Sequence, residues 1–378
     1  MQTAEIEKTA LKSSVGADEK QSLKPEFIMT NCLEECKSND EILLKPSEQL
    51  RKGILSMRMT DLYETIYPVR TPIIEDLLYP GLFLFAGAPK IGKSFLVTQI
   101  GYHVSSGIPL WNRKVRQGTV LCLALEDDFS RIQSRIGRMF GVEYAVPSLV
   151  FSVTSLNLQE GLCDEMENFI QCNPDTRLII IDTLQKVREN LGDKFSYSND
   201  YEIIGQLKKV SDKHGICILV VHHTRKLGAE DRFDTISGTN GLLGCADGAL
   251  LLQKEKRTDN HATLDVVGRD QQDQRLDLTF NLERCVWELS GEETELWKEP
   301  PDPLLEKIAL FVEQQPIGWT GSSSELATLI QSDLAPNILS RKLNIGAGRL
   351  YREHKIRIGI SRSHDGRAVT LWKETPDT

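Results

Sequence analysis

The chain has 378 residues, 40% apolar and 26% charged, a composition typical of globular proteins and unlike that of disordered or fibrous ones. Its net charge of -9 argues against a protein that coats nucleic acid or an anionic membrane with its whole surface. The charge is uneven, because residues 341–373 hold nine Lys and Arg against two Asp and Glu, a local charge of +7. The net value therefore conceals a basic patch near the C-terminus.

The N-terminus and the cysteines favour a soluble cytoplasmic protein. Residues 1–14 lack the apolar stretch of a signal peptide, and the longest apolar runs are far too short to cross a bilayer. The eight cysteines include no CxxC pair, and Cys32 and Cys36 have no partners that would complete a zinc site. Cys122, Cys217 and Cys245 lie in apolar runs, which predicts buried free thiols.

Apolar runs alternate with amphipathic segments and predict an α/β core after a mobile polar tail at 1–45. Strands are expected at 82–86, 119–125, 149–153, 178–181 and 216–221. Helices are expected at 93–106, 129–140, 161–171 and 201–214. These strands are apolar without alternation, which indicates a parallel sheet covered on both faces. Further strands at 249–253, 263–267, 276–280 and 285–289, with short polar connections, predict an antiparallel edge.

A proline-rich stretch at 297–303 marks a predicted domain boundary, since its three prolines cannot continue a helix or a central strand. Beyond it, helices are expected at 304–314, 323–330 and 336–343, and strands at 356–360 and 369–372 around an Asp-Gly turn. This order suggests a winged helix. The expected division is a mobile polar tail at 1–45, an α/β domain at 46–298 and a basic domain at 299–378.

The sequence GAPKIGKS at 87–94 fits G-x-x-x-x-G-K-[ST] at every fixed position, between an apolar strand and an amphipathic helix. The glycines let the backbone curl so that N–H groups point at phosphate oxygens, at the positive end of the helix. Lys93 would reach the β- and γ-phosphates, and the Ser94 hydroxyl would bind Mg²⁺. The expected nucleotide site comprises Gly87, Ala88, Pro89, Lys90, Ile91, Gly92, Lys93, Ser94 and Phe95, with no role assigned to the Lys90 side chain.

Asp182 follows four apolar residues at the end of the strand expected at 178–181. A carboxylate there is costly to desolvate unless a cation compensates it, so Asp182 is expected to hold Mg²⁺ together with Ser94. The alternative is that Asp182 only caps the next turn.

Glu126 is the first polar side chain after the strand at 119–125, on the carboxyl edge where open α/β sheets bind ligands. Hydrolysis requires a group that orients or deprotonates the attacking water, and Glu126 is the candidate base. Asp127 and Asp128 are expected to cap the helix that follows. All three acids could instead simply begin a solvated loop.

His222 and His223 end the strand at 216–221 on the same edge. One of them, with His222 preferred, could contact the γ-phosphate and report hydrolysis to the following loop; a structural role is the alternative. Arg269 follows a late strand near the sheet edge. It could reach the γ-phosphate of a neighbouring subunit as a trans-acting finger, or be an ordinary surface salt-bridge residue.

These motifs occur in an order that resembles a known family. GAPKIGKS, LCLALEDD with Glu126, LIIIDT, VVHHTRK, SGTNGLLGCADGA and VVGRD, within residues 82–289, look like the RecA-like P-loop ATPases of the RepA replicative-helicase type, AAA ATPases of plasmids and other mobile elements. The resemblance implies that Lys93 and Ser94 bind nucleotide and Mg²⁺ and that Asp182 is the Walker B acid. It also implies a catalytic Glu126, a sensor at His222 or His223, and a finger at Arg269.

The resemblance further implies a hexameric ring around single-stranded DNA. The loops after the strands that end in Asp182 and His222 would face the channel and bind DNA phosphates without reading sequence. The residues concerned are Lys186, Arg188, Lys194, Arg225, Lys226 and Arg232. Ordinary solvated loop charges are the alternative.

The C-terminal module lies outside the ATPase resemblance and resembles winged-helix domains of mobile-element replication proteins. In that arrangement the helix with Arg341 and Lys342 would approach a DNA groove, while Arg362 and Arg367 of the hairpin would meet backbone phosphates. A basic protein-docking module is the alternative.

The leading hypothesis is an ATP-driven DNA helicase or translocase that acts on single-stranded DNA, with duplex origin DNA as a further partner. Its rival is a nucleotide-switched DNA-binding regulator that hydrolyses ATP without unwinding DNA. A small-molecule phosphotransferase is a weak third reading, because the sequence offers no evident acceptor pocket.

Overall fold

The structure is a computed structural model, and it describes residues 56–67, 70–188, 197–224, 233, 236, 240–256, 258–293, 296, 299–363 and 366–374. The side chains of 197–200, 240–241, 362–363 and 366–367 are not part of this set. The predicted tail at 1–45, with Cys32 and Cys36, therefore lies outside the described residues.

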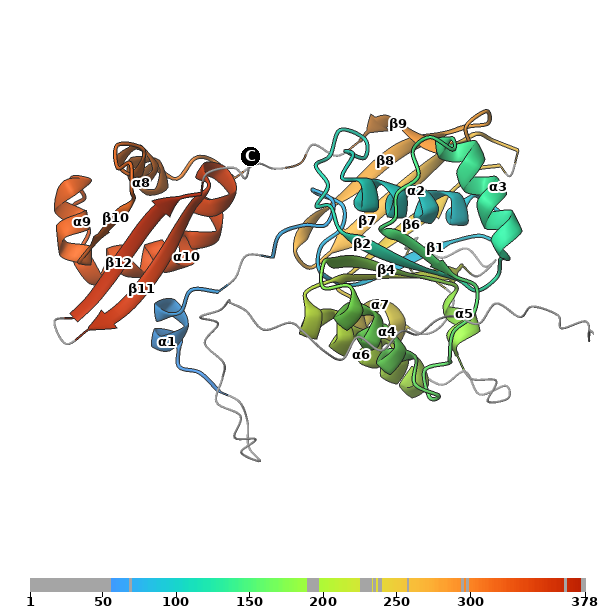
Figure 1. Cartoon of the computed structure of the whole chain (residues 1–378), viewed down its shortest axis with the longest axis horizontal. Coiled ribbons are helices and arrows are strands. Elements are labelled where there is room, and N and C mark those ends of the chain that lie inside the picture. The colour runs from blue at the N-terminus through green and yellow to red at the C-terminus, as the bar shows by residue number, and fades with distance from the viewer. Residues whose placement is uncertain are drawn as a thin grey trace, which may run out of the picture. The chain divides into compact units, whose positions relative to one another are not determined.

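A nine-stranded, mostly parallel sheet forms the core (Figure 1). Its strands are β1 (Gly81–Gly87), β2 (Thr119–Ala124), β3 (Leu149–Ser152), β4 (Thr176–Asp182), β5 (Cys217–His223), β6 (Gly248–Gln253), β7 (His261–Gly268), β8 (Gln271–Asn281) and β9 (Val286–Glu292). The order is β3-β2-β4-β5-β1-β6-β7-β8-β9. The first six strands in this order are parallel, and β7, β8 and β9 continue antiparallel. The predicted parallel sheet with an antiparallel edge is confirmed.

Strand β1 occupies the middle of the sheet, and all seven of its residues are buried. It pairs with β5 on one side and with β6 on the other, so that Gly87 lies opposite both His223 and Leu252. Alternate residues of β1 face two different cores: Phe83 and Phe85 belong to one, Leu82 and Leu84 to the other. Burial on both faces explains why the strand is apolar without alternation.

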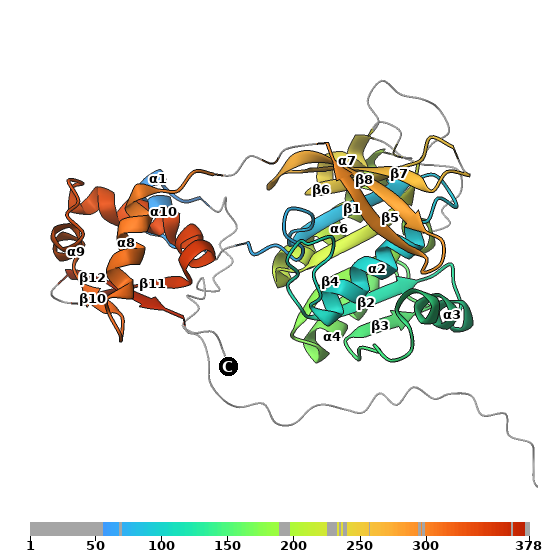
Figure 2. The ribbon, with the colours of Figure 1, turned by 90° about the horizontal axis from the view of Figure 1, so that it is seen from above.

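Helices cover both faces of the sheet (Figures 1 and 2). On one face lie α2 (Lys93–Ser106) and α3 (Phe129–Phe140), and on the other lie α4 (Leu162–Cys172), α6 (Tyr197–His214) and α7 (Asn240–Cys245). A short α5 (Leu184–Val187) follows β4. The bounds expected for α2 and α3 from the sequence agree with the structure, whereas α5 and α7 were not predicted.

The C-terminal residues form a smaller unit with its own apolar core. It contains α8 (Pro303–Glu313), β10 (Trp319–Gly321), α9 (Ser323–Leu329), α10 (Pro336–His354), β11 (Ile356–Ser363) and β12 (Gly366–Lys373). Its antiparallel sheet has the order β10-β12-β11. The domain division expected from the sequence stays a prediction.

The prediction of a short helix at 336–343 was wrong, because α10 continues to His354. Gly346 and Gly348 lower the intrinsic helix propensity of its second half. Tertiary packing compensates, since Ala347 and Leu350 are buried in the unit's core and a Cβ at Gly346 would lie 3.0 Å from Leu305 of α8. The glycine therefore allows α10 and α8 to approach closely.

A further short helix, α1 (Met59–Glu64), was not predicted and packs against α10. The side-chain amide of Asn344 donates a hydrogen bond of 2.9 Å to the backbone oxygen of Tyr63. A segment that precedes the large sheet in sequence thus contacts the C-terminal unit.

Within the described residues, no helix has the length and apolarity needed to cross a lipid bilayer. Cys122, Cys217 and Cys245 are buried free thiols, as their apolar surroundings predict.

Candidate active site

The G-x-x-x-x-G-K-S loop joins the carboxyl end of β1 to the start of α2, in the predicted context. Gly92 has φ of 103°, a left-handed conformation that favours glycine, and α2 begins at the next residue. A Cβ at Gly87 would lie 2.8 Å from the backbone oxygen of Leu252, so only glycine fits there. The loop can therefore turn its N–H groups toward an anion at the positive end of α2.

Lys93 is buried, and its ammonium group lies within the loop. It donates hydrogen bonds to the backbone oxygens of Gly87 (2.7 Å) and Ala88 (3.0 Å), and it lies 3.2 Å from Nδ1 of His223. Burial lowers the pKa of Lys93 to about 8, although the carboxylates of Asp182 and Glu126 oppose this shift. An added phosphate would stabilise the charged form of this side chain.

Asp182 ends β4 and is only 8% exposed. Burial raises the pKa of its carboxyl group, while a hydrogen bond from the Ser94 side chain opposes that shift. Two oxygen ligands beside each other, one of them a poorly solvated carboxylate, match the ligands that Mg²⁺ prefers. Asp182 and Ser94 therefore fit a Mg²⁺ ion bound together with nucleotide phosphates.

Glu126 follows β2 on the same edge of the sheet, and its side chain is exposed. Its carboxylate accepts a hydrogen bond of 3.1 Å from the hydroxyl of Thr183, the residue after Asp182. Asp128 caps α3 by accepting a hydrogen bond from the backbone of Arg131, whereas Asp127 forms an ion pair of 2.7 Å with Arg135. The three consecutive acids thus have three different partners, and Glu126 alone faces the phosphate loop.

The two histidines of β5 have different surroundings, because consecutive strand residues point to opposite faces. His223 meets Lys93 at the loop, and burial together with the charge of Lys93 lowers the pKa of His223. His222 is 5% exposed and does not line the cavity at the loop. His223, rather than the His222 preferred from the sequence, therefore lies at the phosphate loop, and the sensor role itself stays a prediction.

Arg269 lies near the amino ends of the parallel strands β1 and β6. The phosphate loop of the same chain follows the carboxyl end of β1, at the other end of these strands. Gly268 pairs with Gly248, and Gly248 pairs with Phe83 near the amino end of β1. The Arg269 side chain is 57% exposed, and its guanidinium group donates a hydrogen bond to the backbone oxygen of Gly244 and lies 3.7 Å from a carboxylate oxygen of Asp247. Arg269 therefore forms an ion pair with the buried Asp247, away from the phosphate loop of its own chain, and its role as a finger stays a prediction.

A cavity of about 530 Å³ is lined by residues 89–95 of the phosphate loop and by Glu126, Asp182 and His223. Four further residues line it that sequence reasoning did not single out: Arg135, Thr183, Lys254 and Phe280. Lys254 directly follows β6. Glu126 and Asp182 were found as polar residues at the ends of apolar strands, and the same criterion also selects Lys254. No comparable signal exists for Arg135, which reaches the cavity from α3 and lies over the ring of Phe95.

The predicted DNA contacts are placed only in part. Lys194, Arg225, Lys226 and Arg232 lie outside the described residues. Lys186 is exposed on α5, and Arg188 after it is partly buried. On α10, Lys342 is exposed and Arg341 is half-buried, whereas Arg362 and Arg367 are paired residues of β11 and β12 whose side chains are not described.

Several cations of the basic stretch at 341–373 are neutralised by carboxylates. Arg349 forms ion pairs with Glu299 and Glu353. Arg357 pairs with Glu374, and Lys373 pairs with Glu313. The positive charge available on this unit is therefore smaller than the sequence count of +7 suggests.

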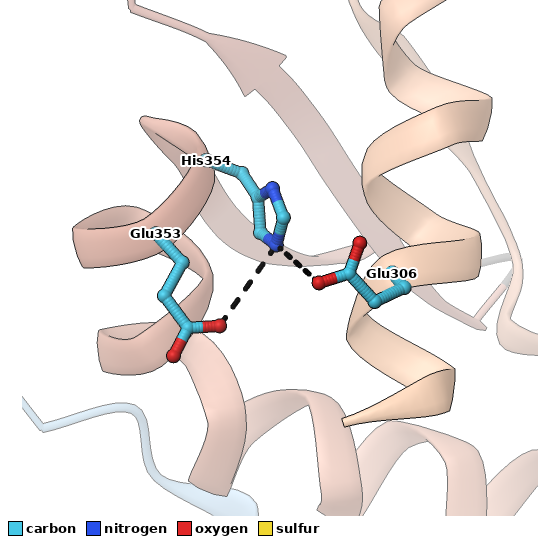
Figure 3. Close-up of side chains that lie close together, drawn as sticks. All are labelled: Glu306, Glu353 and His354. Atoms are coloured by element: carbon cyan, nitrogen blue, oxygen red, sulfur yellow. Dashed lines mark ion pairs between the residues drawn. The ribbon is translucent and has the colours of Figure 1, made fainter. Parts of the chain in front are cut away.

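Figure 3 shows one group of potential metal ligands in the C-terminal unit. His354, at the end of α10, lies 3.5 Å from a carboxylate oxygen of Glu306 on α8 and 3.9 Å from one of Glu353. Glu353 also binds Arg349 at 2.7 Å, and both carboxylates are partly exposed. We interpret this cluster as ion pairs that join α8 to the end of α10.

Comparison with known proteins agrees with this geometry. A family model described as an AAA domain matches residues 51–229. The large domain is similar to an AAA domain over these residues. The family match covers the phosphate loop, Glu126, Asp182 and His223. No curated protein matches the chain.

Three solved structures match about half of the chain. One is described as an ATPase domain, with 14% identity and a TM-score of 0.46 over 55% of this chain and 84% of that one. A DnaB-like replicative helicase has 14% identity and a TM-score of 0.46, and the match covers 55% of this chain and 57% of the helicase. The RadB recombinase has 15% identity and a TM-score of 0.42, covering 55% of this chain and 90% of the recombinase.

Proposed function

We propose that the chain hydrolyses ATP and uses the energy to move along single-stranded DNA, as a helicase or translocase of the RepA type in the replication of a plasmid or other mobile element. The observation that carries the ATPase part is the convergence of Lys93, Asp182, Glu126 and His223 at one sheet edge, from the ends of neighbouring strands. The DNA part rests on the sequence resemblance and on the basic residues that follow β4 and β5.

In the proposed reaction the loop amides and Lys93 bind the phosphates, and Ser94 and Asp182 hold Mg²⁺. The metal would neutralise charge that develops on the transferred phosphoryl group. Glu126 orients and deprotonates the attacking water, and its hydrogen bond from Thr183 holds it in place beside Asp182. His223 would detect the loss of the γ-phosphate through Lys93 and transmit it to the segment after β5.

Arg269 is proposed to complete the site of an adjacent subunit in a ring, because it lies at the edge away from its own phosphate loop. This arrangement would make hydrolysis dependent on assembly. Asp247, which lies beside Arg269 and binds Lys208 of α6, would connect the subunit contact to α6.

The C-terminal unit supports a second candidate, a nucleotide-switched DNA-binding regulator. Its element order, α8-β10-α9-α10-β11-β12, is compatible with the winged-helix arrangement suggested by the sequence. In this reading α10 and the β11–β12 hairpin contact duplex DNA, and ATP binding controls that contact without unwinding.

One experiment distinguishes these functions. Purified protein is assayed for phosphate release with and without single-stranded DNA, and then for strand separation on a forked duplex. A helicase shows DNA-stimulated hydrolysis and opens the fork, whereas the regulator binds DNA and leaves the fork intact. Loss of all phosphate release in Lys93→Ala, with turnover retained in Lys114→Ala, would assign the activity to this site; turnover retained in Lys93→Ala would reject the assignment.

A further inference from the structure

Trp287 lies on β9, which three strands separate from β1 in the sheet, yet its side chain reaches the phosphate loop. The residue is fully buried, and its indole Nε1–H donates a hydrogen bond of 3.2 Å to the backbone oxygen of Gly92. The antiparallel edge therefore supports the loop directly, in addition to extending the sheet.

The backbone of Trp287 is itself held against α2. The side-chain amide of Gln99 accepts a hydrogen bond from the Trp287 N–H at 2.8 Å and donates one to the Trp287 C=O at 2.9 Å. The indole of Trp111 donates a second hydrogen bond to the same oxygen, also at 2.9 Å. The two hydrogen bonds of Gln99 fix the position of Trp287 relative to the helix that begins in the loop, and they satisfy the Trp287 oxygen without Trp111.

The oxygen that Trp287 binds belongs to the peptide unit between Gly92 and Lys93. Within a planar trans peptide the C=O and the following N–H point in opposite directions, so fixing the Gly92 oxygen also fixes the direction of the Lys93 N–H. That N–H is among the first amides of α2, which have no partner within the helix and are available to a phosphate.

Gly92 could not keep this position if it carried a side chain. Its φ of 103° is unfavourable for other residues, and a Cβ would lie 3.0 Å from the indole ring. The Gly92 oxygen also accepts the backbone N–H of Leu96 at 3.2 Å, so the indole is a second donor to an oxygen that the helix already satisfies. Removing the indole donor would therefore leave no unsatisfied group and would affect chiefly the orientation of the peptide.

We propose that Trp287 is a positioning residue for nucleotide binding: its indole N–H holds the Gly92 carbonyl so that the Lys93 amide faces the phosphates. The assignment rests on the proposed ATPase function and deepens it. It predicts that nucleotide affinity depends on one N–H group located on a strand far from the loop in sequence.

The test compares Trp287→Phe with Trp111→Phe in the full chain. Each change removes one indole donor, but only the first donor contacts the loop. We expect Trp287→Phe to raise the dissociation constant for Mg²⁺–ATPγS and the KM for ATP about two- to tenfold, with kcat within about twofold of wild type, as for the loss of one hydrogen bond. Trp111→Phe should change none of these values.

Replacement of residue 287 by 3-benzothienylalanine, which keeps the shape of tryptophan and lacks the N–H, guards against a folding defect in Trp287→Phe. Titration calorimetry, at temperatures below the melting transition of every variant, gives the dissociation constants for Mg²⁺–ATPγS. Wild-type affinity in the benzothienyl variant, or equal losses in the variants at 287 and 111, would overturn the assignment to Trp287 and leave the ATPase intact. Failure of the wild-type chain to bind ATPγS would instead overturn the proposed function, and this assignment with it.

Discussion

The ammonium nitrogen of Lys93 lies 3.2 Å from Nδ1 of His223, which joins the phosphate loop after β1 to the end of β5. The two groups can share a hydrogen bond only if His223 is neutral, and burial and the charge of Lys93 both lower the pKa of His223. This pair connects the cation that would bind phosphate to the strand whose following segment is proposed to meet DNA.

Nucleotide affinity should decrease as the pH rises above about 8, where free Lys93 loses its proton. At pH 9 about a tenth of the protein would carry charged Lys93, so the apparent dissociation constant for ADP should be about tenfold higher than at pH 7. Titration calorimetry in buffers of different ionisation enthalpy should detect proton uptake on binding at pH 9. Affinity that is constant across this range would contradict the assigned role.

The same shift predicts how stability depends on pH. The pKa of Lys93 in the folded protein, about 8, lies below the ordinary value of 10.5. Between these pH values the unfolded chain binds more protons than the folded protein, so the free energy of unfolding increases with pH in this range. Lys93→Met removes this contribution. We expect the free energy of unfolding of Lys93→Met, measured with urea and compared with that of wild type at the same pH, to be most favourable below pH 8. This difference should decline as the pH rises toward 10.5.

Asp182→Asn should stabilise the ligand-free protein and weaken its response to nucleotide. Burial raises the pKa of Asp182, which means that the folded state disfavours its charge. Thermal unfolding should show a higher melting temperature for the variant alone, and a smaller increase on addition of ATPγS with Mg²⁺ than in wild type. A variant that is less stable than wild type without ligand would indicate that Asp182 has a structural role.

Glu126→Gln should separate binding from hydrolysis. The amide can still accept the hydrogen bond from Thr183 but cannot take a proton from water, so we expect kcat to fall about 10²- to 10⁴-fold while ATPγS still binds. Asp128→Asn is the matched control, since asparagine caps a helix as well as aspartate does and activity should be kept. Normal phosphate release in Glu126→Gln would exclude this residue as the base.

The two histidines should respond differently to substitution. His223→Ala removes a contact to a charged group and should lower kcat about 10- to 100-fold. His222→Ala removes a buried side chain and should reduce the free energy of unfolding by about 1–3 kcal/mol without a similar loss of kcat. The reverse pattern in steady-state kinetics and urea unfolding would restore His222 as the sensor.

Lys342→Ala should weaken binding to duplex DNA and lower the dependence of affinity on salt by about one counterion. Lys342 is exposed on α10, in the segment proposed to approach DNA. Lys307→Ala on α8 is the control, because Lys307 is exposed in the same unit on a helix with no proposed DNA contact. Fluorescence anisotropy at several salt concentrations gives the slopes, and equal slopes for the two variants would argue against α10 as the contact.

The sequence was sufficient where local pattern and chemistry agree. The phosphate loop with its strand and helix, the apolar strands, and the acids after β2 and β4 follow from residue type and order alone, because parallel strands end at one edge. Helix propensity predicted too short a helix at α10, because two glycines lower helix stability there and the burial of Ala347 and Leu350 compensates for them.

Contacts between distant segments depend on the tertiary structure. Which histidine meets Lys93 depends on the face that each residue of β5 presents, and Trp287 reaches Gly92 only because the antiparallel edge packs against α2. Folding likewise reduces the positive charge that the basic C-terminal stretch presents to a partner, because Arg349, Arg357 and Lys373 pair with carboxylates. Composition fixes how many charges the chain carries, whereas packing determines which of them stay exposed to a partner, because pairing depends on distance in space rather than on order in the chain.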